Sequence, residues 1–197
     1  TYTIANGVDP NDTATVNITV AAVTPTGPLN GTYFVGTAGH FTTITSAVDY
    51  LNTNGVSGAV TFLLTDTLYD NDSGETFPIT IDQFTGTSAV NTVTFKPNTG
   101  LSVSVEGENI NGSTGVPAIF KLDGADNIIF DGSDEDGGTT RNLTIKNNSD
   151  INYLHRSVIW VASDDSNGAT NNTVNTLTSD KRTEIRTLLL LLVSTQE

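Results

Sequence analysis

Short apolar segments alternate with polar turns through most of the chain. Ile119–Leu122 and Ile128–Phe130 are separated by Asp-Gly-Ala-Asp-Asn, and Asp-Gly follows the second segment. Apolar runs of this length suit half-buried strands, and Asp, Asn and Gly adopt the turn conformations that end strands. The same pattern predicts further strands at Val60–Leu64, Ile79–Ile81, Val93–Phe95, Val103–Val105, Leu143–Ile145, Val158–Val161 and Val174–Leu177.

The spacing of these strands favours a solenoid. Alternate strands form two interleaved series that return after about 24 to 32 residues, as in coils with more than one strand per turn. An antiparallel sandwich would place turns about every 8 to 12 residues and would use tight hairpins. Asn residues at strand edges suit stacked coil turns, and they equally suit ordinary turns: Asn127, Asn142, Asn147, Asn148, Asn171 and Asn172.

A single helix is predicted in front of these strands, from about residue 42 to residue 54. Thr42 or Thr43 can cap its start, and Asn-Thr-Asn before Gly55 supplies a stop. Its apolar face follows the helical period and consists of Phe41, Ile44, Ala47, Val48 and Leu51.

The segment Phe41-Thr-Thr-Ile-Thr-Ser-Ala-Val-Asp49 resembles the Phe-x-Thr-Ile-x-x-Ala-Val segment that opens right-handed parallel β-helices of the pectin-lyase-like superfamily. The resemblance covers roughly residues 32–178. It implies an all-β fold, a right-handed parallel β-helix in which the helix covers the first coil. Such a helix would bury the first apolar layer and remove an exposed sheet edge.

The first 20 residues differ from the coils. Strand-forming residues flank an acidic turn, and Ala14, Val16, Ile18 and Val20 share one face of the second strand. This hairpin resembles the closing hairpin of Ig-like or cadherin-like repeats in large bacterial surface proteins, which implies neighbouring domains in a longer chain. Two Pro and two Gly then interrupt regular structure and predict a linker over residues 21–31.

Residues 179–197 differ in composition again. They hold three of the eight basic residues and five consecutive Leu. One interpretation is a capping helix from about Asp180 to Val193, and the other is an extraneous or disordered tail. The apolar run Leu188–Val193 is far shorter than the roughly 20 residues that a membrane-spanning helix needs, so no membrane span is predicted.

The charge balance excludes some partners. The chain has 8 Lys and Arg against 22 Asp and Glu, a formal net charge of -14. Phosphate binding depends on clustered cations, so we expect no nucleic-acid partner and no anionic membrane surface. The carboxylates remain free to hold calcium. The chain has no Cys, which excludes disulfides and thiolate metal sites.

Two acidic clusters are candidate calcium sites. Asp70, Asp72 and Glu75 alternate with other oxygen donors around a Gly, but they lack the full twelve-residue EF-hand spacing. The second cluster consists of Asp131, Asp134 and Asp136, with Glu135 between them. Packed carboxylates repel each other unless a cation or solvent separates them. A solvated turn is the simpler explanation of each cluster, and calcium binding is the alternative.

The last candidate residues are those that could cleave or bind carbohydrate. His155 and Arg156, beside Asp164 and Asp165, are the best acid–base grouping, although turn roles explain them as well. Trp160 lies in an alternating strand, where an outward ring would be a candidate sugar platform and an inward ring would be core packing.

These observations predict a non-enzymatic segment of a secreted or cell-surface bacterial protein that serves adhesion, glycan binding or structural spacing. Polysaccharides or cell-surface glycans are the expected partners. The alternative is a polysaccharide lyase or glycoside hydrolase of the same superfamily, because fold alone does not fix function.

Overall fold

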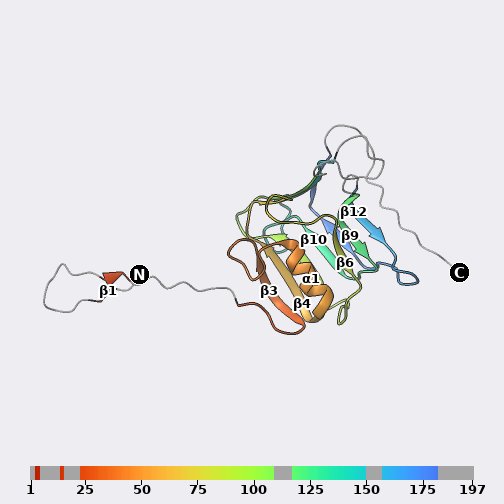
Figure 1. The fold of residues 1–197 in the computed structure, drawn as a ribbon, viewed down its shortest axis with the longest axis horizontal. Helices are drawn as coiled ribbons and strands as arrows, with labels where there is room; N and C mark the ends of the chain where they lie inside the picture. The colour runs from red at the N-terminus through yellow and green to blue at the C-terminus, as the bar shows by residue number, and fades with distance from the viewer. Residues whose placement is uncertain (1–2, 5–13, 16–22, 109–116, 150–156, 182–197) are drawn as a thin grey trace.

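The computed structural model describes residues 3–4, 14–15, 23–108, 117–149 and 157–181, and Figure 1 shows its fold. Within these ranges the chain forms fourteen strands and one α-helix. Every strand pair in the three larger sheets is parallel. The expected all-β class is confirmed, and the parallel pairing rules out the antiparallel sandwich.

The strands belong to three parallel sheets, which we number in the order in which the chain reaches them. The first sheet has the order β13-β10-β7-β4-β3, the second β14-β11-β8-β5 and the third β12-β9-β6. The first sheet contains β3 (Leu29–Val35), β4 (Val56–Leu64), β7 (Val93–Pro97), β10 (Ile128–Asp131) and β13 (Thr173–Asn175). The second contains β5 (Leu68–Tyr69), β8 (Val103–Gly107), β11 (Leu143–Asn147) and β14 (Thr178–Lys181), and the third contains β6 (Ile79–Asp82), β9 (Ala118–Asp123) and β12 (Ser157–Ala162).

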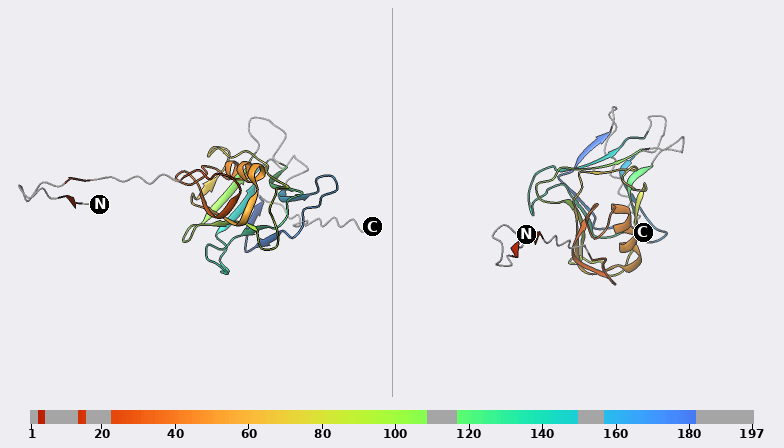
Figure 2. Two further views of the ribbon diagram at one scale, coloured as in Figure 1. Left: turned by 90° about the horizontal axis from the view of Figure 1, so that it is seen from below. Right: turned by 60° about the vertical axis from the view of Figure 1, so that its left-hand side comes forward.

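The chain visits the sheets in a fixed order, and we use the word coil for one passage through all three. The described coils are β4-β5-β6, β7-β8-β9 and β10-β11-β12, and β13-β14 begin another. The right-hand view of Figure 2 shows the coils stacked from the orange end that holds α1 to the blue strand of the last coil. The expectation of two interleaved series is therefore wrong, because each coil contributes three strands.

Register across the coils places like residues above one another. Phe62 pairs with Phe95, and Phe95 pairs with Phe130, across β4, β7 and β10. All three rings are buried, and their centroids are 5.0 Å and 5.5 Å apart. Burial of aromatic rings contributes strongly to core stability, so this Phe column is a main source of cohesion between coils.

Helix α1 (Ile44–Asn54) confirms the helix predicted at residues 42–54. Thr43 is its N-cap, and its hydroxyl accepts a hydrogen bond from the Ser46 N–H at 3.0 Å. Gly55, with φ of 66°, ends the helix in a conformation that favours Gly. The buried helical residues are Ile44, Ala47, Val48 and Leu51, as the apolar spacing predicted.

The side chain of Asn52 links α1 to the edge of the third sheet. Its Nδ2 donates to the Thr80 carbonyl at 3.0 Å, and its Oδ1 accepts the Asp82 N–H at 3.1 Å. These are bonds that a neighbouring strand would otherwise make with β6. Figure 1 shows α1 next to β6, so the helix covers the edge of the first coil as predicted.

Two predicted segment boundaries fall inside strands. The linker expected over residues 21–31 ends too late, because β3 begins at Leu29 and pairs with β4. Its Pro and Gly residues hid a strand with a register irregularity between Leu29 and Gly31. The boundary expected after residue 178 falls within β14, and residues 182–197 lie outside the described part of the chain.

Near the N-terminus, β1 (Thr3–Ile4) pairs antiparallel with β2 (Ala14–Thr15), as the predicted hairpin requires. Among the described residues, no helix has both the length and the apolar character needed to cross a membrane.

Candidate functional site

Trp160 lies on the outer face of the third sheet, and 44% of its surface is exposed. Its neighbours Ile159 and Val161 pack against the hydrophobic core. Successive side chains of a strand point to opposite faces, so the inward positions of these two residues direct Trp160 outward. Of the two orientations that the sequence left open, the structure has the one that presents the ring to solvent.

Lys121 lies beside Trp160, because the two residues are paired in register across β9 and β12. The Lys121 Nζ lies 5.2 Å from the centre of the Trp160 ring, a cation–π contact. The same ammonium group forms an ion pair with the carboxylate of Asp123. Thr80 of β6 is in register with Lys121 and extends the row. A row of polar and aromatic groups therefore crosses the outer face of the third sheet.

Asp82 and Asp123 form a second row at the ends of β6 and β9, where they are in register. Burial raises the pKa of the Asp82 carboxyl, and the negative charge of Asp123 raises it further, whereas the cation of Lys121 lowers it. We name the two rows together the third-sheet site: Thr80, Asp82, Lys121, Asp123 and Trp160.

A hollow of about 340 Å³ adjoins the third-sheet site between α1 and β6. Asp49 and Asn52 line it from the helix, and Thr80 and Asp82 line it from the strand. Carboxylate, amide and hydroxyl groups of this kind accept and donate hydrogen bonds to hydroxyl or ammonium groups of a ligand. The hollow and the Trp160 ring thus lie on one side of the molecule, separated by the single strand β9.

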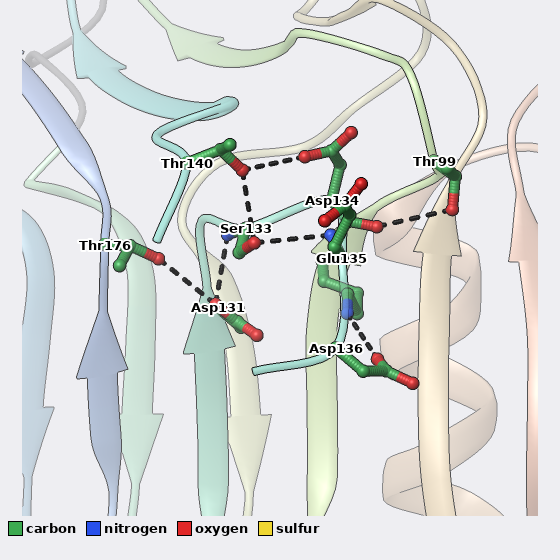
Figure 3. A network of polar contacts seen from close by, with 9 residues as sticks. Thr99, Asp131, Ser133, Asp134, Glu135, Asp136, Thr140 and Thr176 are labelled. Carbon is green, nitrogen blue, oxygen red and sulfur yellow. Dashed lines mark hydrogen bonds and ion pairs between the residues drawn. The ribbon is translucent and has the colours of Figure 1, made fainter. Parts of the chain in front are cut away.

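The acidic segment Asp131–Asp136 begins at the last residue of β10, and Figure 3 shows its polar contacts. Asp131 Oδ1 accepts a hydrogen bond from the Thr176 hydroxyl at 3.2 Å. Asp134 Oδ1 accepts one from the Thr140 hydroxyl at 2.7 Å, and its Oδ2 accepts the Gly100 N–H at 2.9 Å. The two carboxylates therefore bind different parts of the fold.

Asp136 has yet another partner. Its Oδ1 lies 2.7 Å from the Nζ of Lys96, whose side chain is 5% exposed. The hydrogen bond and the positive charge of Lys96 lower the pKa of Asp136, and the Gly100 N–H lowers the pKa of Asp134. Asp134 and Asp136 thus fasten the segment to the preceding coil, whereas Asp131 contacts the following one.

The other acidic cluster serves α1. Glu75 is buried, and its Oε1 accepts the Ile44 N–H at 2.6 Å. Its Oε2 accepts the Thr45 N–H at 2.8 Å and the Thr45 hydroxyl at 2.5 Å. Nearby, Asp70 Oδ1 accepts the Ser73 N–H at 2.7 Å within its own turn, and Asp72 is exposed. Glu75 thus satisfies backbone donors that a helix start leaves unpaired.

These contacts bear on the calcium hypothesis. Within the ranges that the structure describes, no three His, Asp or Glu side chains are grouped so as to hold a metal ion. The carboxylates of Glu75, Asp134 and Asp136 are each bonded to a separate protein donor. Calcium binding at either cluster stays a prediction, and an ion there would have to compete with these donors for the carboxylate oxygens.

The candidate acid–base residues are placed as follows. His155 and Arg156 lie outside the described residues. Asp164 and Asp165 are exposed in a turn after β12, where the Asp164 N–H donates to the Asn167 carbonyl at 2.9 Å and Asp165 has φ of 49°. Asp164 lies near enough to Asp82 for its charge to raise the Asp82 pKa.

Sequence reasoning identified Trp160 but missed Lys121, Asp123, Thr80 and Asp82. The signal was present in Phe-Lys-Leu-Asp at residues 120–123, which alternates as Ile-Trp-Val does at residues 159–161. Aligning the two strands in one sheet would have placed Lys121 next to Trp160. That alignment requires the coil length, which the expectation of two series had set too short.

Comparison with known proteins finds no matching family model, no matching curated protein and no matching solved structure.

Proposed function

We propose that this chain is a right-handed parallel β-helix segment of a secreted or cell-surface bacterial protein, and that the third-sheet site binds glycan. Three parallel sheets visited in a fixed order and a helix over the first coil support the β-helix. The same features agree with the resemblance of residues 41–49 to pectin-lyase-like proteins. The net charge of -14 supports a partner other than nucleic acid.

The observation that carries the glycan proposal is the outward Trp160 beside polar side chains in register. A pyranose ring presents an apolar C–H face and a rim of hydroxyl groups. An exposed indole ring can stack on the apolar face, whereas Thr80, Asp82 and Asp123 can bond the hydroxyl groups. Trp160 is 44% exposed, as a stacking surface requires.

A second candidate function is hydrolysis or lyase cleavage of the bound glycan. The side-by-side carboxyl groups of Asp82 and Asp123 favour it, because carboxyl groups can serve as general acid and base, and burial raises the pKa of Asp82. Asp123 would then be the second carboxylate, and Lys121 a cation beside the sugar. Binding without cleavage needs fewer assumptions, because exposed Trp and hydrogen-bonding groups suffice for it.

The experiment is a glycan array probed with the chain, with and without calcium, followed by product analysis on each glycan that binds. Trp160→Ala should abolish binding, whereas Phe34→Ala should not. Phe34 is a matched control because it is a 41% exposed aromatic residue on the first sheet. Binding without turnover supports the binding function, and released oligosaccharides support the enzyme. Absence of binding across glycan classes, or equal binding by the Trp160 variant, contradicts the proposal.

A further inference from the structure

The third-sheet site has little positive charge to offer a ligand. Among the described residues of β6, β9 and β12, Lys121 is the single cationic side chain, and Asp123 neutralises it in an ion pair. Asp82 and the nearby Asp164 add negative charge at the ends of the strands. A ligand on this face therefore meets a net negative surface.

The hollow between α1 and β6 is also negatively charged. Asp49 lines it from the exposed side of the helix, and Asp82 lines it from β6. Asp82 Oδ2 accepts a weak bond from the Asn52 amide at 3.3 Å, which leaves acceptor capacity on this carboxylate. A ligand ammonium group placed in the hollow would lie between two carboxylates.

The spacing between strands sets the distance from the hollow to the Trp160 ring. Thr80, Lys121 and Trp160 are in register on three adjacent strands, and neighbouring strands lie about 4.8 Å apart. One pyranose unit of an extended glycan has a length close to this spacing. A sugar stacked on Trp160 would place the sugar two units away at the hollow.

From this arrangement we infer that the third-sheet site selects glycans of amino sugars with free amino groups, such as glucosamine oligomers, and rejects polyuronates. This inference rests on the proposed glycan-binding function. Asp49 and Asp82 attract the sugar ammonium group. The carboxylates of a uronate chain would be repelled by these negative charges, and the cation of Lys121 is already paired with Asp123.

The test compares the affinities of three hexasaccharides by calorimetry at mildly acidic pH and low salt: glucosamine, N-acetylglucosamine and galacturonate. We expect glucosamine hexamer to bind at least about tenfold more tightly than galacturonate hexamer, with a preference that falls as salt is added. N-acetylglucosamine hexamer keeps the shape and removes the charge, so it should bind with intermediate affinity.

Variants assign the selectivity to the two carboxylates. Asp82→Asn and Asp49→Asn should each lower the ratio of the glucosamine hexamer affinity to the N-acetylglucosamine hexamer affinity several-fold. Asp49 lies on an exposed face of the helix, so the Asp49→Asn variant should fold. It therefore tests the inference even if Asp82→Asn fails to fold. Equal or tighter binding of galacturonate, or variants with unchanged selectivity, would overturn the inference while the glycan-binding function stands. If none of the hexamers and no array glycan binds, the proposed function itself fails.

Discussion

The Glu75 carboxylate accepts the Ile44 N–H at 2.6 Å and so ties the segment before β6 to the start of α1. Glu75→Ala would leave this donor and the Thr45 N–H without a partner in a buried setting. We expect a loss of about 1–3 kcal/mol in the free energy of unfolding. Chemical denaturation measures it, and Asp72→Ala, an exposed neighbour, is the control that should change little.

The buried Glu75 carboxyl should also make the free energy of unfolding depend on pH. Burial raises its pKa above the usual 4.5, so the folded state holds the proton more tightly than the unfolded state does. The free energy of unfolding, relative to that of Glu75→Gln, is therefore highest below pH 4.5. It should fall as the pH rises from 4.5 through the raised pKa. A relative stability that rises over this window would show that the helix donors outweigh burial.

Asn52 supplies strand-like bonds to the edge of β6, so Asn52→Ala should expose that edge. We expect a cost of about 1–2 kcal/mol in the free energy of unfolding, chiefly from the lost bonds to the Thr80 carbonyl and the Asp82 N–H, and faster hydrogen exchange at the Asp82 amide. Thr53→Ala, which removes a bond within α1, is the control. Unchanged exchange at Asp82 would mean that α1 covers this edge without the help of Asn52.

Phe95 lies at the centre of the Phe column, between Phe62 and Phe130. Phe95→Ala removes a buried ring from the middle of the stack and should cost about 3–5 kcal/mol in the free energy of unfolding. The exposed Val90→Ala should stay within about 0.5 kcal/mol of the parent. A cost for Phe95→Ala as small as that of the control would mean that the column does not hold the coils together.

The pKa of the Asp136 carboxyl should be lowered because Lys96 donates a hydrogen bond to it. NMR titration of its carboxyl should give a pKa below the usual 3.8, and Lys96→Met should return it towards that value. Its contribution to stability is present above pH 3.8 and is lost as the pH falls through the lowered pKa. An Asp136 pKa that is equal in both proteins would exclude the ion pair in solution.

The sequence predicted most strands and the helix because each has a local signal. The period of Ile44, Ala47, Val48 and Leu51 identifies α1 without tertiary information. By contrast, β5 consists of Leu68–Tyr69 alone, too short to alternate, and the sequence did not predict it. The first coil therefore appeared to have two strands, although all three strands of the next two coils were predicted. Gly and Pro around Leu29 similarly hid β3, which is fixed by its pairing with β4.

The candidate site was harder to predict, since it depends on register between strands far apart in sequence. Trp160 was recognisable as an aromatic residue in a strand, but its partner Lys121 becomes its neighbour through the β9–β12 register. The contacts of the acidic clusters were also not predictable from the sequence. Glu75 and Asp136 look like free carboxylates in the sequence, and their partners Ile44 and Lys96 lie in other elements.

The central claim is that a glycan contacts Trp160, and the chain's only Trp makes this directly measurable. Intrinsic Trp fluorescence should be recorded during titration with glucosamine hexamer, together with quenching by acrylamide. Because Trp160 is 44% exposed, a sugar stacked on its ring should shift the emission to shorter wavelength and reduce the quenching. If a glycan that binds by calorimetry changes neither signal, it binds elsewhere and the account of the third-sheet site is contradicted.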